Sequence, residues 1–151
     1  MADQTNNDIL NRLVARLYRS LLQYTVECWP WTTSSESPDG KSPEEKTVDQ
    51  MAARQQEFLG RLVDLLQARG DVVDFGNFPD NSELHYVSLD YLLGKLIADE
   101  QKLVADLEAA RAAIHNDPPA ATLLVELIAA EKENVSRLRE LAAKAAAAMT
   151  A

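Results

Sequence analysis

The chain has 151 residues, of which 46% are hydrophobic and 26% charged, and its formal net charge is −9. This length and composition fit one folded domain and exclude a disordered chain, because enough apolar residues are present to build a core. No apolar run reaches the roughly 20 residues of a membrane span, and the negative charge disfavours nucleic acid and anionic membrane surfaces as partners, so we expect a cytoplasmic protein.

The first predicted helix follows from apolar residues that recur in steps of three and four from Leu10 to Cys28. Asn6 or Asn7 is expected to cap its start, and Pro30 to end it, because proline lacks the amide donor that a helix needs. Cys28 is the single cysteine, which excludes an intrachain disulfide and a cysteine zinc cluster. We expect a buried structural thiol there, followed by a loop rich in Ser, Thr, Pro and Gly.

The second predicted helix begins at Ser42, which is suited to cap it, with Pro43 at the first helical position. Gly70 is expected to end it. From Gly70 to Leu84 the helical pattern disappears, although several apolar residues remain. We expect this connection to be ordered but not helical, because those side chains need a surface to pack on.

The third predicted helix, Leu89–Ile114, carries the clearest apolar repeat of the chain. Asp117 and Pro118 are typical of the start of the next helix. The apolar stripe of this fourth helix covers Leu124–Leu141 and is followed by an alanine-rich tail that we expect to fray. No segment shows the alternation of a strand, so the predicted fold is all-α: a four-helix bundle in a single domain, residues 1–151.

The connection from Gly70 to Leu84 spans about 50 Å when extended, which is enough to cross the bundle from end to end. Such a crossover makes the second and third helices parallel. The loop after the first helix is similarly long, so loop length alone leaves the connectivity open.

Four polar residues interrupt the apolar stripes: Gln55, Glu100, Glu131 and Asn134. Each lies near the midpoint of its helix, and the midpoints of helices that run side by side meet at one height. We therefore expect the four side chains to converge in the bundle centre, together with Tyr24 or Ser20 and with Arg16.

Three stretches resemble the ferritin-like superfamily, namely Leu17–Ser20 with Tyr24, the end of the second helix at Arg69 and Gly70, and Asp99–Gln101 followed by Leu107 and Glu108. The first is similar to the LYxS stretch of a ferritin, and the last resembles the segment around a bacterioferritin metal glutamate. The resemblance implies a bundle with a crossover between the second and third helices, assembly as a homodimer, and a dimetal centre.

The metal ligands that the resemblance implies are incomplete. The family places a Glu on each of two helices and a Glu-x-x-His on each of the other two. Here Arg16 occupies the position of the first Glu, Gln55 and Phe58 replace one Glu-x-x-His, and Asn134 follows Glu131 in place of the second His. No Glu-x-x-His occurs in the chain, and Gln56 stands where bacterioferritins have their haem methionine.

Two interpretations of the polar residues follow, unless the helix faces are misjudged. In one, Gln55, Glu100, Glu131 and Asn134 form a closed hydrogen-bond network, because buried carboxylates require partners or protonation. In the other, Glu100 and Glu131 bind a divalent metal ion, with Gln55 and Asn134 as further oxygen ligands. Such hard ligands suit Mg²⁺, Ca²⁺ or Mn²⁺.

The functional expectation that follows is a non-catalytic ferritin-like bundle, acting as a small interaction or structural protein without a cofactor. The alternative is a metal-binding protein centred on Glu100 and Glu131. A third possibility is a helical binder of a small apolar ligand. The aromatic residues Trp29, Trp31, Phe75 and Phe78 near the loops are expected either to cap the end of the bundle, which we favour, or to form an exposed apolar patch. We expect a homodimer from the resemblance and, in the second case, from this patch.

Overall fold

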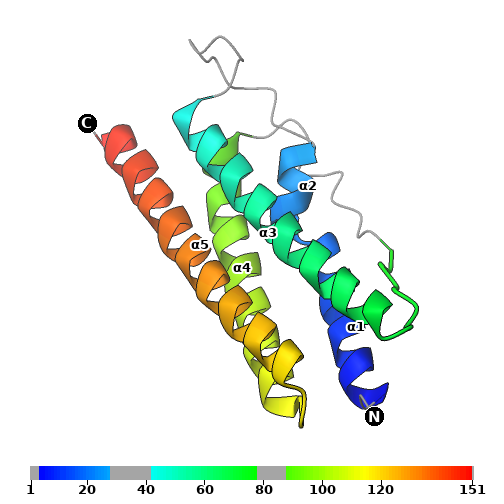
Figure 1. Ribbon diagram of the computed structural model, residues 1–151. Coiled ribbons are helices and arrows are strands. Elements are labelled where there is room, and N and C mark those ends of the chain that lie inside the picture. Colours follow the sequence, from blue (N-terminus) through cyan, green and yellow to red (C-terminus); the bar gives the residue numbers. More distant parts are fainter. Residues whose placement is uncertain (1–3, 28–41, 78–87, 151) are drawn as a thin grey trace.

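The computed structural model describes residues 4–27, 42–77 and 88–150, and no strand occurs within these ranges. The helices are α1 (Gln4–Tyr18), α2 (Leu21–Glu27), α3 (Pro43–Ala68), α4 (Leu89–Ala113) and α5 (Pro118–Thr150). The helices pack side by side as rods, and α1 and α2 follow each other along one rod that is broken between them (Figure 1). The predicted all-α bundle is confirmed.

Each rod packs mainly against two others: α1 and α5 both contact α3 and α4. Ion pairs give the directions, because Arg54 pairs with Glu133 and Arg61 with Glu126, so α3 runs antiparallel to α5. The α4–α5 hairpin is antiparallel as well. It follows that α3 and α4 run in the same direction, as Figure 1 also shows, and lie diagonally opposite each other.

The first helix is not continuous, which corrects the prediction of one helix as far as Cys28. It breaks at Arg19 and Ser20, and α2 restarts with the Ser20 hydroxyl accepting a hydrogen bond from the Gln23 amide at 3.2 Å. A carboxylate oxygen of Asp99 on α4 accepts the Leu21 amide at 3.0 Å. These two acceptors satisfy amides that the break would otherwise leave unpaired.

Asn6 and Asn7 do not cap the first helix, which is a second correction. Both lie inside α1 and are buried, because they bind residues that are distant in the sequence. Asn6 donates to the His115 carbonyl at 2.8 Å, and Asn7 accepts from Arg69 at 3.0 Å. Together with Asp117, these residues form a buried group at one end of the bundle, hereafter the end cluster: Asn6, Asn7, Arg69 and Asp117.

The other predicted helix ends agree with the structure, with one exception. The Ser42 side chain accepts from the Glu45 amide, and Asp117 accepts from the Ala120 amide at the start of α5. Gly70 follows α3 with φ of 73°, a conformation that glycine adopts without strain. The alanine-rich tail is the exception, because α5 remains helical through Thr150.

The connection after Gly70 is non-helical over residues 71–77, as predicted for that part. It lies along α1, where Asn11 binds the Val72 carbonyl and the Asp74 amide, and Phe75 packs on Tyr18 with ring centroids 4.9 Å apart. The predictions for Cys28, Pro30, residues 31–41, the remainder of the connection, and three of the four aromatic residues fall outside the described residues.

The hydrophobic core consists of two separate clusters. One gathers Leu10, Leu17, Leu62 and Leu107 with their neighbours, and the other contains Leu22, Leu96 and Leu138 together with Met51. Between them lies a level at which every rod contributes polar side chains. None of the helices in the described ranges combines the length and apolar character that a bilayer crossing requires.

Candidate functional site

The level between the two core clusters is a buried polar layer. All four predicted residues lie there: Gln55 and Asn134 are 1% exposed, and Glu100 and Glu131 are 0% exposed. Ser20 and Gln23 join them from the break between α1 and α2. These six residues are called the central layer below: Ser20, Gln23, Gln55, Glu100, Glu131 and Asn134.

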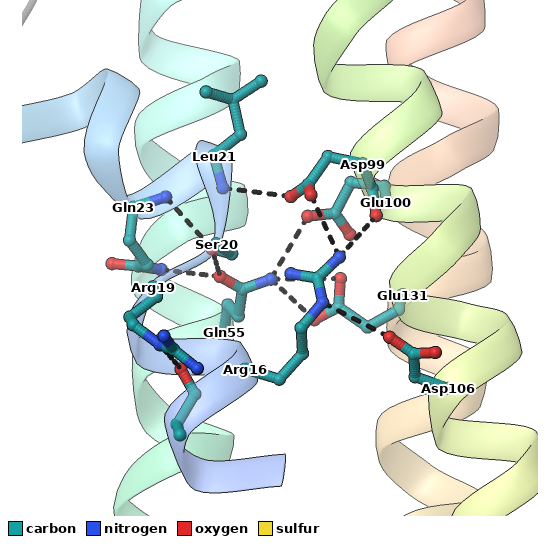
Figure 2. A network of polar contacts seen from close by, with 11 residues as sticks. Arg16, Arg19, Ser20, Leu21, Gln23, Gln55, Asp99, Glu100, Asp106 and Glu131 are labelled. Carbon is teal, nitrogen blue, oxygen red and sulfur yellow. Dashed lines mark hydrogen bonds and ion pairs between the residues drawn. The ribbon is translucent and has the colours of Figure 1, made fainter. Parts of the chain in front are cut away.

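The layer is organised by the side-chain amide of Gln55. Its oxygen accepts from the Ser20 hydroxyl at 2.7 Å and from the side-chain nitrogen Nε2 of Gln23 at 3.0 Å. Two donors on that side fix the oxygen there, so the nitrogen must face the opposite way. Figure 2 shows it directed between the two carboxyl groups, where it donates to Glu100 at 3.2 Å and to both oxygens of Glu131 at 3.2 and 3.3 Å.

The two carboxyl groups differ in their hydrogen bonding. Glu131 accepts from Asn134 at 3.2 Å in addition to its bonds from Gln55, whereas Glu100 accepts only the single bond from Gln55. Burial, and after it the hydrogen bond and negative charge of Glu131, raise the pKa of Glu100 to about 10. Glu100 is therefore protonated at neutral pH, and Glu131 is the carboxyl group that accepts more hydrogen bonds.

Two oxygen atoms of the layer are left over. Among the described residues, the buried side-chain atoms without a hydrogen-bond partner are Glu100 Oε2 and Asn134 Oδ1. A protonated Glu100 converts its free oxygen into a donor facing the Glu131 carboxylate, which is the arrangement of two carboxyl groups that share one proton. The Asn134 oxygen remains unpaired, so the layer keeps one acceptor that could bind a further donor or a cation.

Arg16 and Tyr24 do not join the layer. The Arg16 guanidinium points to the side of α4, where it donates to the Asp99 carbonyl and carboxylate at 2.9 and 3.0 Å and to Asp106 at 3.4 Å. Tyr24 is half-buried and packs against the core cluster that contains Met51. The charge of Glu131 thus has no cationic partner within the layer.

Sequence reasoning missed Gln23 and Asp99. Gln23 binds the Ala52 carbonyl at 2.8 Å and accepts from Gln56 at 2.8 Å, which anchors the broken helix to α3. A signal was present, because Ser20 stands three residues before Gln23, as an N-cap stands before N3. The role of Asp99 in accepting the Leu21 amide depends on packing between distant segments and leaves no local signal.

The layer offers few ligands to a metal ion. Within the described part of the chain, no group of three or more His, Cys, Asp and Glu side chains is close enough to hold one. The Gln55 N–H groups occupy the space between the two carboxyl groups, where a bridging metal needs an oxygen or nitrogen lone pair. His115 is exposed at the end of α4, far from this level.

Compared with known proteins, the chain matches no family model, no curated protein and no solved structure.

Proposed function

We propose that the chain is a ferritin-like bundle in which a hydrogen-bonded layer stands where relatives hold two metal ions, and that it serves as a non-catalytic interaction or structural protein. One observation carries this proposal. The Gln55 amide donates to both Glu100 and Glu131, and its orientation is fixed from behind by Ser20 and Gln23. A donor in that position binds both carboxyl groups through hydrogen bonds and needs no metal to do so.

The ferritin-like part of the proposal is supported by the directions of the helices. The second and third rods, α3 and α4, run parallel, and both are antiparallel to their neighbours α1 and α5. This is the order expected when the long connection after Gly70 crosses the bundle. Of the positions to which the resemblance assigns metal ligands, Gln55, Glu100, Glu131 and Asn134 lie in the central layer, whereas Arg16 binds Asp99 and Asp106 beside it.

Binding of a divalent cation is the second candidate, and the free oxygens favour it. Glu100 Oε2 and Asn134 Oδ1 are buried and unpaired, and both are hard ligands. A cation at Glu100 and Glu131 requires the Gln55 amide to turn, which breaks its bonds from Ser20 and Gln23. This cost is the reason for preferring the network.

Thermal unfolding with and without metal separates the two candidates. Wild-type protein treated with chelator is melted in the presence of micromolar Mg²⁺, Mn²⁺ or Fe²⁺. A metal ion that binds only the folded state would raise the melting temperature. Because the proposed layer binds no metal, we expect the melting temperature to stay unchanged. A rise of several degrees that is abolished by Glu100→Gln or Glu131→Gln would establish the metal site instead.

A gain-of-function variant sharpens this test. Gln55→Glu combined with Asn134→His supplies a third carboxylate and restores Glu-x-x-His on α5, so this variant should acquire a metal-dependent rise in melting temperature. Gln50→Glu, on the exposed side of α3, is the control for the added charge. A double variant that folds but ignores all three metals would contradict the assignment of this layer to the ferritin-like dimetal position.

We also propose a homodimer, which is supported by the apolar surface beside α1. Tyr18, Val72 and Phe75 are 37%, 80% and 39% exposed and belong to α1 and the connection packed on it. An apolar surface of this kind is typical of an interface. Light scattering should give about twice the 16.7 kDa of the chain, and Phe75→Ser should shift the mass towards the monomer. A wild-type monomer at high concentration would end the proposal.

A further inference from the structure

A groove of about 460 Å³ runs between α1 and α4 on the outside of the bundle. Its lining divides into two kinds of side chain. One part is charged, with Arg12 and Arg16 of α1, Arg19 directly after it and Asp106 of α4, and the other part is apolar, formed by Ile9, Leu13, Ala109, Ala110 and Ala113. A smaller hollow of about 200 Å³ shares Arg16 and Arg19 and adds Asp99 and Lys102 of α4.

The charged part is mainly basic, which is unusual for a chain with a net charge of −9. Arg12 and Arg16 lie one turn apart on α1 and Arg19 follows directly after the end of this helix, and like charges at such spacing repel one another. Asp99 and Asp106 compensate Arg16.

The other cations of the groove have no acidic partner. In residues 4–27, 42–77 and 88–150, no carboxylate pairs with Arg12, Arg19 or Lys102. Arg19 donates only to backbone carbonyls, those of Ala15 and Asn77. Uncompensated cations around a concave surface raise the local concentration of anions.

The apolar part exists because α4 carries alanines where it faces α1. Leu13 and Ala110 are buried and form the floor, while Ala109 and Ala113 lie at the exposed wall. Larger side chains at these alanines would fill the space. Since α1 and α4 are antiparallel, the apolar half lies towards Ile9 and Ala113, and the basic half lies towards Arg19 and Lys102.

We propose that this groove binds a small amphiphilic carboxylate, with its hydrocarbon part on the alanines and its carboxylate between Arg12 and Arg19. The volume lies within the range of about 300 to 1,000 Å³ that is typical of small-molecule sites. Guanidinium groups bind carboxylates through paired hydrogen bonds, which gives the charged end its specificity. This site lies outside the bundle core, so it is independent of whether the central layer holds a metal.

The test uses decanoate as the probe, below the concentration at which it forms micelles. Calorimetry should show saturable binding to the wild-type protein, and amide resonances of residues 9–19 and 106–113 should shift in its presence. Arg12→Gln or Arg19→Gln should each raise the dissociation constant about tenfold, the loss of one charge-assisted hydrogen bond. Arg139→Gln, an exposed arginine of α5, is the control for charge and should leave the constant unchanged.

A second pair of variants tests the apolar half. Ala109→Leu with Ala113→Leu should abolish binding of decanoate, whereas Ala129→Leu with Ala143→Leu, at exposed positions of α5, should not. Circular dichroism verifies that each variant is folded. Acetate binding as tightly as decanoate, decanol binding as tightly as decanoate, or resonance shifts confined to other helices would each overturn the proposal.

Discussion

The bundle contains two clusters of buried polar side chains, and the carboxyl groups in them are stabilised in different ways. In the end cluster, Arg69 donates hydrogen bonds from two nitrogens to the carboxylate of Asp117 and a further one to Asn7 at 3.0 Å. The central layer has two carboxyl groups, two free oxygens and no cation. At the end of the bundle an arginine balances the charge of the carboxylate. In the central layer the carboxyl groups are stabilised only by hydrogen bonds and by protonation.

This difference indicates which of the two clusters lowers the stability of the fold. The end cluster joins the start of α1, the end of α3 and the turn before α5, so its polar groups define how the ends meet. The central layer interrupts a core that apolar residues would fill, since apolar leucines lie directly above and below it. A buried polar level of this kind is expected to lower stability relative to apolar packing.

The largest effect is expected from Glu131→Ala. This change removes the acceptor of Gln55 and Asn134 and leaves their donors buried without partners, so the free energy of unfolding should fall by about 3 to 5 kcal/mol. Chemical denaturation measures it. A loss below about 1 kcal/mol would mean that the layer is not organised around Glu131.

The matching change in the end cluster is Arg69→Met, which keeps much of the apolar stem. It strands Asp117, but at the edge of the bundle, where the Arg69 side chain is 14% exposed and water can enter. We expect a loss of about 2 to 3 kcal/mol by the same measurement. If Arg69→Met cost more than Glu131→Ala, the ranking of the two regions would be wrong.

Replacing the layer as a whole should hurt less than breaking it. With Gln55, Glu100, Glu131 and Asn134 all changed to Leu or Met, we expect a loss of no more than about 1 kcal/mol or a gain, because apolar packing often matches a buried polar cluster. Ser20 and Gln23 keep their bonds to each other and to the Ala52 carbonyl. A quadruple variant less stable than Glu131→Ala would contradict this.

The two regions are also expected to respond to pH in opposite directions. Burial raises the pKa of Glu100 from 4.5 to about 10, so the folded state binds more protons than the unfolded state between these values, and stability should fall as the pH rises through this range. Glu100→Gln should flatten this slope and stabilise the protein at pH 8.

At Asp117 the sign is reversed, because hydrogen bonds from Arg69 lower the pKa of this carboxyl group. Here the unfolded state binds more protons in acid, so stability is lost as the pH falls below about 4. Asp117→Asn should remove that loss, at the cost of lower stability at neutral pH. Unfolding curves collected from pH 3 to pH 9 on both variants check the two signs together.

Much of the central layer could be predicted, because a polar residue on an apolar stripe is visible in the sequence. Gln55, Glu100, Glu131 and Asn134 each interrupt a regular period, and the structure buries all four at one level. The break at Ser20 could not be predicted in this way, since the apolar period continues through Leu21. It depends on Asp99, which lies on another helix.

The end cluster could not be predicted from the sequence for a related reason. Asn6 and Asn7 have the residue type of a helix cap, and only the packing of α1 against the turn before α5 gives them other partners. Asp117 was recognised as a cap but not as the partner of Arg69. Local patterns identify which residues are polar and buried, whereas the partner of each one is decided by contacts distant in sequence.

The central claim is that the central layer holds one neutral and one charged carboxyl group without a metal ion. Carbon-13 resonances of the glutamate carboxyl groups test it directly, in chelated protein at pH 7 and again after addition of Mg²⁺. We predict one resonance in the protonated range, absent in Glu100→Gln and unmoved by Mg²⁺. Ionised carboxyl groups throughout, or a buried resonance that shifts when Mg²⁺ is added, would contradict the claim.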